Sequence, residues 1–168
     1  MTVNETTPKS GRRTATKPRA QAVEQTAQPE QSMPAAVGAA QALTPEINTA
    51  LHAASDKKAL TPIVLDLRTI GGFTDYFVIT SGTNQRQVQA IADEVEARLK
   101  KEGTRPARIE GYKTAEWVLL DYGDFIVHVF EDKARRFYDL ERLWRDAASV
   151  ELPPELRGEA DSSLHREA

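Results

Sequence analysis

The 168-residue sequence contains no cysteine, which excludes disulfide bonds, thiol catalysis and cysteine-ligated zinc. It has only three histidines, His52, His128 and His165, and they lack the His-Glu-x-x-His spacing of a zinc site. No apolar run approaches the roughly 18 residues that a membrane helix requires. We therefore expect a soluble protein that does not enter a membrane and holds no metal or other cofactor.

Positive charge is not in excess either. The formal net charge is −3, and residues 46–152 carry 15 Lys and Arg against 18 Asp and Glu. This mildly acidic balance provides no global positive field that would attract phosphate groups. We predict no direct, sequence-specific contact with nucleic acid, so any role in a ribonucleoprotein has to use a protein surface.

Hydrophobic periodicity is missing from residues 1–43, which are rich in Thr, Ala, Gln and Pro. Such a segment buries too little apolar area to offset chain entropy, so we predict a disordered tail. Its early basic residues resemble part of a transit peptide, but the apolar face is absent, and a solvated tail is the preferred interpretation. Pro153-Pro154 ends the patterned region. The predicted domain therefore spans residues 44–152, and residues 153–168 are predicted to form a flexible tail.

Hydrophobic spacing between the tails predicts an α+β fold of three helices packed on a mixed, mainly five-stranded sheet. The order is α-β-β-α-β-β-β-α, with β-β at 62–70 and 75–81 as an antiparallel hairpin. Four apolar residues recur at helical spacing after Thr44 and predict the first helix. The stretch 82–103 is the clearest helix. The last helix begins at Asp132 and places these apolar residues on one side: Phe137, Leu140, Leu143 and Trp144.

The stretch "EWVLLDYGDFIVHVF", residues 116–130, predicts two strands joined by a turn at Tyr122-Gly123. A two-residue turn there pairs Asp121 with Asp124, Leu119 with Ile126, and Trp117 with His128. Because strand side chains alternate, one face is entirely apolar and is the expected core side. The other face mixes apolar, acidic and imidazole groups, which is typical of an interaction surface if no helix covers it. Its residues are Trp117, Leu119, Asp121, Asp124, Ile126 and His128.

Structural interpretations of these residues stay open from the sequence alone. His128 is equally explained as a satisfied residue of an apolar strand, and Trp117 as part of the core. Asp121 and Asp124 flank a turn glycine, where aspartate bonds the local backbone.

An enzymatic alternative comes from "ITSGTNQRQ", which runs from a strand through Ser81-Gly82 into a helix. Helix N-termini bind phosphate, so this segment is compatible with nucleotide binding. Nucleotidyl transfer also requires converging carboxylates for Mg²⁺. Only Asp75, Asp121 and Asp124 are near, and no acidic pair alternates along one strand. We therefore expect a protein without catalysis.

Three blocks of sequence resemble the ribosomal silencing factor family, also called the RsfS or Iojap family. They are "TDYFVITSGTNQRQVQAIADEVEARLKKEG", "EGYKTAEWVLLDYGDFIVHVF" and "RRFYDLERLW", in the family's order, and they cover most of residues 55–147. The resemblance implies a fold similar to nucleotidyltransferases without the catalytic acids.

The resemblance also implies a function and a partner. A member of this family binds the large ribosomal subunit through the universal large-subunit ribosomal protein number fourteen, in the cytoplasm. It blocks joining of the small subunit and lowers translation when nutrients are scarce. Organelle relatives imply large-subunit assembly as an alternative role, and a homodimer is left open. The implied partner-binding residues are Trp117, Leu119, Asp121, Tyr122, Asp124 and His128, with Trp117 as the anchor.

Overall fold

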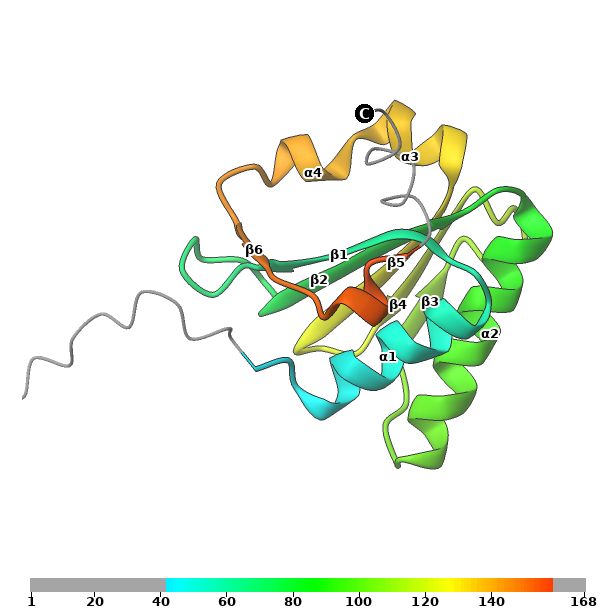
Figure 1. Cartoon of the computed structure of the whole chain (residues 1–168), viewed down its shortest axis with the longest axis horizontal. Helices are drawn as coiled ribbons and strands as arrows, with labels where there is room; N and C mark the ends of the chain where they lie inside the picture. The colour runs from blue at the N-terminus through cyan, green and yellow to red at the C-terminus, as the bar shows by residue number, and fades with distance from the viewer. Residues whose placement is uncertain (1–41, 159–168) are drawn as a thin grey trace, which may run out of the picture. The chain divides into compact units, whose positions relative to one another are not determined.

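The fold is organised around one mixed β-sheet. The computed structural model describes residues 42–158, so the predicted tails lie outside the described residues, except for their inner ends at 42–43 and 153–158. Figure 1 shows the following elements: α1 (Pro45–Asp56), β1 (Leu60–Asp66), β2 (Tyr76–Gly82), α2 (Gln85–Lys101), β3 (Arg108–Glu110), β4 (Trp117–Asp121), β5 (Phe125–Glu131), α3 (Asp132–Tyr138), α4 (Leu140–Leu143), β6 (Ala148–Val150) and the 3-10 turn η1 (Pro154–Leu156).

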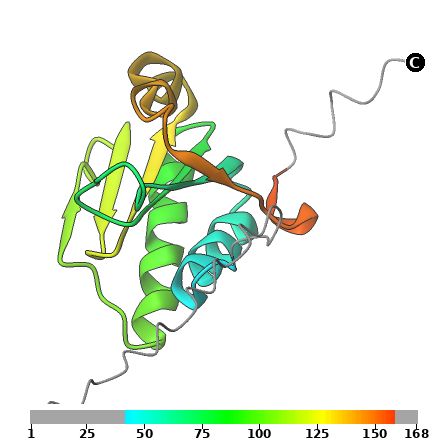
Figure 2. The same cartoon turned by 90° about the vertical axis from the view of Figure 1, so that its left-hand side faces the viewer.

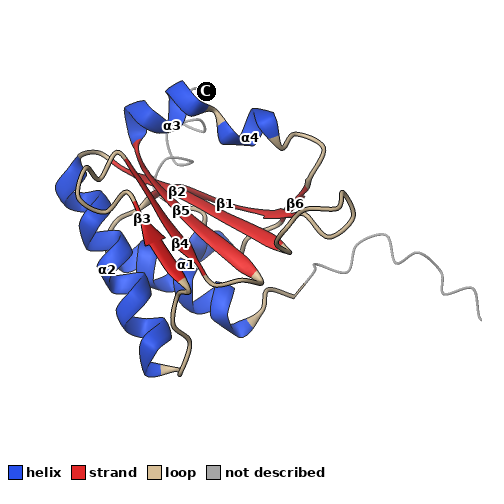
Figure 3. Cartoon of the chain, turned by 180° about the vertical axis from the view of Figure 1, so that it is seen from behind, coloured by secondary structure: helices blue, strands red, loops and turns tan. Residues whose placement is uncertain are grey.

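The sheet has the strand order β3-β4-β5-β2-β1-β6 (Figure 3). β2 and β5 run parallel, and every other neighbouring pair is antiparallel. The predicted β1–β2 pairing is confirmed, and so is the predicted α+β class. The sixth strand was not expected, because β6 has only three residues and shows no alternation of apolar and polar side chains.

Helices cover both faces of this sheet. α1 and α2 lie against one face and form the larger core cluster with the inward residues of β4 and β5. α3 and α4 lie over the opposite face, where Leu140 joins a smaller cluster around Phe77 and Phe130 (Figure 2). Strand β1 is consequently buried on both sides, with Val64 in the larger cluster and Leu65 in the smaller one.

The first helix begins after Thr44, as the sequence predicts, and α2 begins at Gln85, three residues inside the predicted stretch 82–103. The Thr44 hydroxyl accepts a hydrogen bond from the Ile47 N–H at 3.3 Å and caps α1. The Asn84 side chain caps α2 by accepting from the Gln87 N–H at 2.9 Å. The apolar stripe of α2 is fully buried, which confirms the amphipathic pattern.

The last helix does not run continuously as predicted. Asp139 adopts a left-handed conformation, φ 46° and ψ 55°, and divides the segment into α3 and α4. Aspartate tolerates this region better than most residues do, because its short polar side chain bonds locally. The break separates the predicted apolar side: Leu140 is buried, whereas Phe137 and Leu143 point to solvent.

One buried side chain holds α3 against the sheet. The guanidinium of Arg135 is 8% exposed and donates to the Thr61 carbonyl at 2.8 Å and to the Ser81 hydroxyl at 3.2 Å. Its Nε–H donates to the Glu141 carboxylate of α4 at 2.8 Å. A largely buried cation is tolerated when its donors are paired, as those on Nε and Nη1 are here. Arg135 therefore connects β1, β2, α3 and α4.

Ordered chain continues past the predicted boundary at Pro153. Leu152 and Leu156 are buried in the cluster formed with α1, and Leu156 belongs to η1. Two prolines in sequence suggested the end of the domain, but Pro154 starts a short 3-10 turn. No helix among residues 42–158 combines the length and the apolarity needed to cross a membrane.

The Arg135 contacts generate a stability prediction. Arg135→Met removes the donor of the Ser81 hydroxyl, the Thr61 carbonyl and the Glu141 carboxylate, so we expect the free energy of unfolding to fall by about 3 kcal/mol. Urea denaturation followed by circular dichroism measures this change. The matched control is Arg136→Met, at the exposed neighbouring position, with a change within about 0.5 kcal/mol. Equal effects of the two substitutions would contradict the connecting role of Arg135.

Candidate docking surface

The β4–β5 hairpin has a register two residues away from the predicted one. Trp117 pairs with Phe130 and Leu119 pairs with His128, whereas the sequence suggested that Trp117 faces His128. The reason is the turn, which centres on Gly123-Asp124 instead of Tyr122-Gly123, since the Tyr122 N–H donates to the Phe125 carbonyl at 3.0 Å. A shift of two residues preserves the assignment of side chains to faces.

Trp117 lies on the face covered by α3 and α4, and it is half-buried. Its ring stacks on Phe130 with centroids 4.9 Å apart, and the Tyr138 ring lies 5.1 Å away. The indole Nε1–H donates to Nδ1 of His128 at 3.1 Å. Trp117 is therefore partly a core residue and partly a surface residue.

The loop before β4 fixes the backbone of Trp117. Gly111 has a φ of 75°, and a Cβ at this position would lie 2.0 Å from the Trp117 carbonyl oxygen. The close approach requires glycine. Ala115 is fully buried with a φ of 51°, so the loop enters the strand in one conformation.

His128 is buried at 3% exposure, so it cannot contact a partner directly in this conformation. Burial lowers the pKa of His128 to about 3 and keeps the imidazole neutral. The neutral ring accepts from Trp117 through Nδ1 and meets the Phe77 ring edge-on at 4.6 Å. Its Nε2 has no hydrogen-bond partner among residues 42–158. His128 is therefore a buried residue of the strand with one unpaired ring nitrogen, and its Nδ1 orients Trp117.

Tyr122 does not share the face of Trp117, whereas Asp121 ends β4 on that face. Tyr122 stacks on Phe125 at 4.8 Å and packs on the cluster beneath α2. Burial of its hydroxyl, together with the nearby Glu96, raises the pKa of Tyr122 well above its usual range. The Asp121 carboxylate accepts from the Gly123 N–H at 2.9 Å, as the turn interpretation proposes, and Asp124 is exposed.

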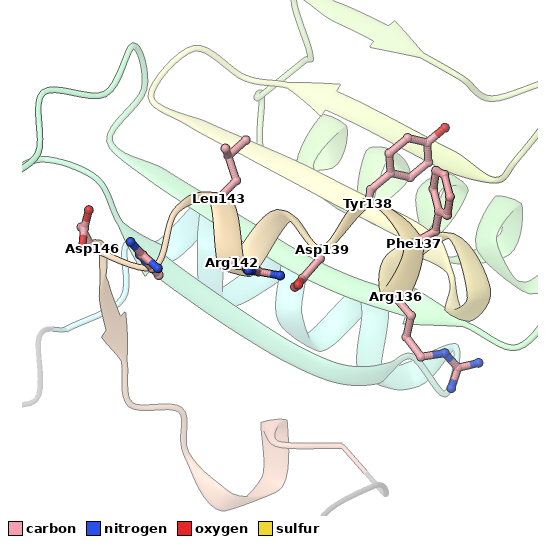
Figure 4. A pocket seen from close by; sticks show the side chains of 8 residues that line it. Arg136, Phe137, Tyr138, Asp139, Arg142, Leu143 and Asp146 are labelled. Carbon is pink, nitrogen blue, oxygen red and sulfur yellow. The ribbon is translucent and has the colours of Figure 1, made fainter.

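Three exposed apolar or aromatic side chains lie on α3 and α4 instead, and two of them are the most exposed large apolar residues among 42–158. Phe137 is 81% exposed, Leu143 is 75% exposed and Tyr138 is 49% exposed. We call these three residues the apolar ridge. Figure 4 shows the Phe137 and Tyr138 rings next to each other at the end of α3, with Leu143 projecting from α4. Helical spacing predicted Phe137 and Leu143 on the packed side of one helix, so this surface was not expected. The signal available was Asp139, a residue type that tolerates the left-handed conformation.

The ridge borders a shallow depression of about 700 Å³ with mixed charge. Three arginines and two aspartates line it beside the ridge: Arg136, Arg142, Arg145, Asp139 and Asp146 (Figure 4). Phe73, 74% exposed, lies near the same face, with its ring 6.2 Å from Trp144. Exposed apolar groups surrounded by charged residues are typical of a protein interaction site.

The strand-to-helix segment suggested for nucleotide binding is occupied by its own side chains. The Gln87 carboxamide accepts from the Thr83 N–H at 2.8 Å, and the Ser81 hydroxyl contacts Arg135. These groups therefore already have partners at the start of α2. Among residues 42–158, no three His, Cys, Asp or Glu side chains gather in a way that would hold a metal ion.

Comparisons with known proteins agree on one family. The family described as "Ribosomal silencing factor during starvation" matches residues 40–168. The chain is 43% identical over 106 residues to the ribosomal silencing factor RsfS of Halalkalibacterium halodurans, covering 63% of this chain and 91% of that protein. It is 35% identical over 75 residues to the mouse "Mitochondrial assembly of ribosomal large subunit protein 1", covering 43% and 33% of the two chains. A crystal structure from Chromobacterium violaceum is similar with a TM-score of 0.58 at 33% identity, covering 68% and 92%.

The buried imidazole generates a prediction about pH. Since the pKa of His128 is about 3 in the folded state, and about 6.5 in an unfolded chain, the unfolded state binds the additional proton between these values. The contribution to stability is complete above pH 6.5 and is lost as the pH falls toward 3. Between pH 6.5 and 4.5 the wild type should lose about 2 kcal/mol more than His128→Gln in urea titrations.

The exposed His52 provides the matched control for this experiment. His52→Gln should follow the wild-type pH dependence. If His128→Gln also follows it, the imidazole is not buried in the neutral form, and the proposed orientation of Trp117 is wrong.

Proposed function

Because the chain belongs to the ribosomal silencing factor family, as its sequence motifs predicted, we propose that it represses translation by binding the large ribosomal subunit. The partner is the universal large-subunit ribosomal protein number fourteen, at the face where the small subunit docks. The bound domain prevents subunit joining by occupying that space, and it acts in the cytoplasm when nutrients are limiting. It requires no catalysis and no cofactor.

The observation that carries this proposal is the apolar ridge. Phe137 and Leu143 expose most of their surface although the same segment buries Leu140 and Arg135. Aromatic side chains at the centre of an interface contribute a large share of the binding free energy. A protein partner that covers the ridge removes this apolar area from water, which is favourable by roughly 25 cal/mol per Å².

The proposed contact surface is revised from the one that the sequence suggested. Its centre is the apolar ridge together with Trp117 and Leu119. These two half-buried residues pack against the smaller core cluster around Phe77 and Phe130. Asp121 and Asp124 lie at the hairpin turn and form an acidic rim. His128 supports Trp117 from below, and Tyr122 packs toward α2.

Charge favours a basic protein as the partner. Residues 46–152 carry 15 basic and 18 acidic side chains, so the domain repels the phosphates of ribosomal RNA and complements a basic ribosomal protein. An interface of about 800 Å² per partner is sufficient for specific binding. Steric exclusion of the small subunit then needs no conformational change in the repressor.

A role in large-subunit assembly is the second candidate. It is favoured by the name of the mouse relative, which refers to mitochondrial assembly of the large subunit. The two roles use the same contact and differ in timing. A silencing factor binds mature subunits and lowers their association with small subunits, which light scattering detects. An assembly factor is found on precursor particles, which gradient fractionation separates from mature ones.

Phe137→Ala tests the docking surface without removing a core contact. We expect its affinity for purified large subunits to fall about 30-fold, equivalent to about 2 kcal/mol, because the substitution removes an exposed anchor. Co-sedimentation at a series of subunit concentrations measures this change. Trp117→Ala is less informative, because it also removes the stacking on Phe130 and costs folding stability.

The control for this substitution is Tyr112→Ala, at an exposed aromatic position whose hydroxyl donates to Asp93 of α2. It should bind as the wild type does. A Phe137 variant with unchanged affinity would remove the ridge from the interface. Wild-type protein that does not sediment with large subunits would contradict the proposed function itself.

A further inference from the structure

Two carboxylates face each other where β4 begins and β5 ends. The Glu131 N–H donates to the Glu116 carbonyl at 2.8 Å, which extends the hairpin register by one residue pair beyond Trp117 and Phe130. Residues opposite each other on antiparallel strands have neighbouring side chains, and two like charges in that position repel. Neither glutamate takes part in an ion pair within the described chain, residues 42–158.

These carboxylates line a cavity of about 470 Å³ beside α3. We call it the acidic aromatic pocket, and its lining residues are Glu116, Glu131, Lys133, Ala134, Phe137 and Tyr138. Two carboxylates and one ammonium group give it a negative charge. It adjoins the arginine-lined depression, since Phe137 and Tyr138 contribute to both.

Aromatic rings form one corner of this pocket. The Phe137 and Tyr138 rings lie 5.1 Å apart and are nearly perpendicular, at 87°. Tyr138 is in turn 5.1 Å from the Trp117 ring. Both ridge residues are exposed, so ring faces are accessible to a ligand from solvent. Aromatic faces attract cations, and the attraction increases when the cation is shielded from water.

We propose that the acidic aromatic pocket receives an arginine side chain of the ribosomal-protein partner, an inference that rests on the proposed function. The flat face of a guanidinium stacks on an aromatic ring, and the N–H groups at its edge donate two parallel hydrogen bonds to a carboxylate. The pocket offers both groups side by side. Its occupation also relieves the repulsion between Glu116 and Glu131.

Other occupants satisfy the pocket less well. A phosphate group of ribosomal RNA would be repelled by the two glutamates, and an apolar side chain would leave them buried and unpaired. A lysine ammonium forms single hydrogen bonds and holds its hydration shell more strongly than a guanidinium does. A second copy of this chain would need to present an arginine, and it is distinguished by sedimentation of the protein alone.

The first experiment measures binding of the full chain to purified large subunits. The variant Glu116→Gln/Glu131→Gln keeps the side-chain size and removes both charges. We expect an affinity about 10-fold to 100-fold lower, together with a weaker dependence on salt concentration. Glu155→Gln, at an exposed position on η1, is the matched control and should bind as the wild type does. Wild-type affinity of the double variant overturns the pocket and leaves the proposed function standing.

The second experiment does not depend on the ribosome. Amide NMR spectra of the full wild-type chain are recorded during titration with N-acetyl-argininamide and, separately, with its neutral isostere N-acetyl-citrullinamide. We expect shifts at residues 116, 131, 137 and 138 with the arginine compound alone. If neither compound shifts these residues, or both do equally, the pocket does not recognise a guanidinium. If the wild type fails to bind large subunits, the proposed function is wrong, and this titration decides the pocket by itself.

Discussion

The hydrogen bonds of Arg135 determine where the exposed apolar residues of this domain lie. One guanidinium joins β1 and β2, through Thr61 and Ser81, to Glu141 on α4. The two fixed points lie on opposite sides of Asp139, where the chain adopts its left-handed conformation. Between these points Leu140 is buried, whereas Phe137 and Tyr138 are exposed. The apolar ridge therefore follows from a buried polar contact several residues away.

The same arrangement separates stability from recognition. Leu140, Arg135 and His128 are buried and hold the segment and Trp117 in place. Phe137, Tyr138 and Leu143 make few internal contacts and are available to a partner. The surface around them has two chemically different sides, with arginines along α4 and glutamates at the end of the β4–β5 pair. A basic ribosomal protein that carries an arginine and an apolar patch fits the glutamate side, and this pairing orients it on the domain.

Local patterns were sufficient to predict much of the fold. The cap of α1, the stripe of α2 and the two faces of the β4–β5 hairpin depend on neighbouring residues, and sequence spacing records them. An error of two residues in the hairpin register is invisible to this approach, because the side-chain period of a strand is also two. The exposure of the ridge could not be predicted in the same way. It depends on contacts between Arg135 and residues 54 and 74 positions earlier in the chain, and on the backbone of a single aspartate. Burial of His128 likewise follows from the rings of Phe77 and Trp117 around it, on other strands, and not from the strand that carries it.

Hydrogen–deuterium exchange of the full chain, alone and saturated with purified large subunits, tests the central claim most directly. If the ridge and its supporting strand are the docking surface, the subunit should slow exchange in residues 116–119 and 132–144. The exposed amides of the α1–α2 side should exchange at the same rate in both samples. Protection over α1 and α2 without protection of α3 and α4 would contradict the account.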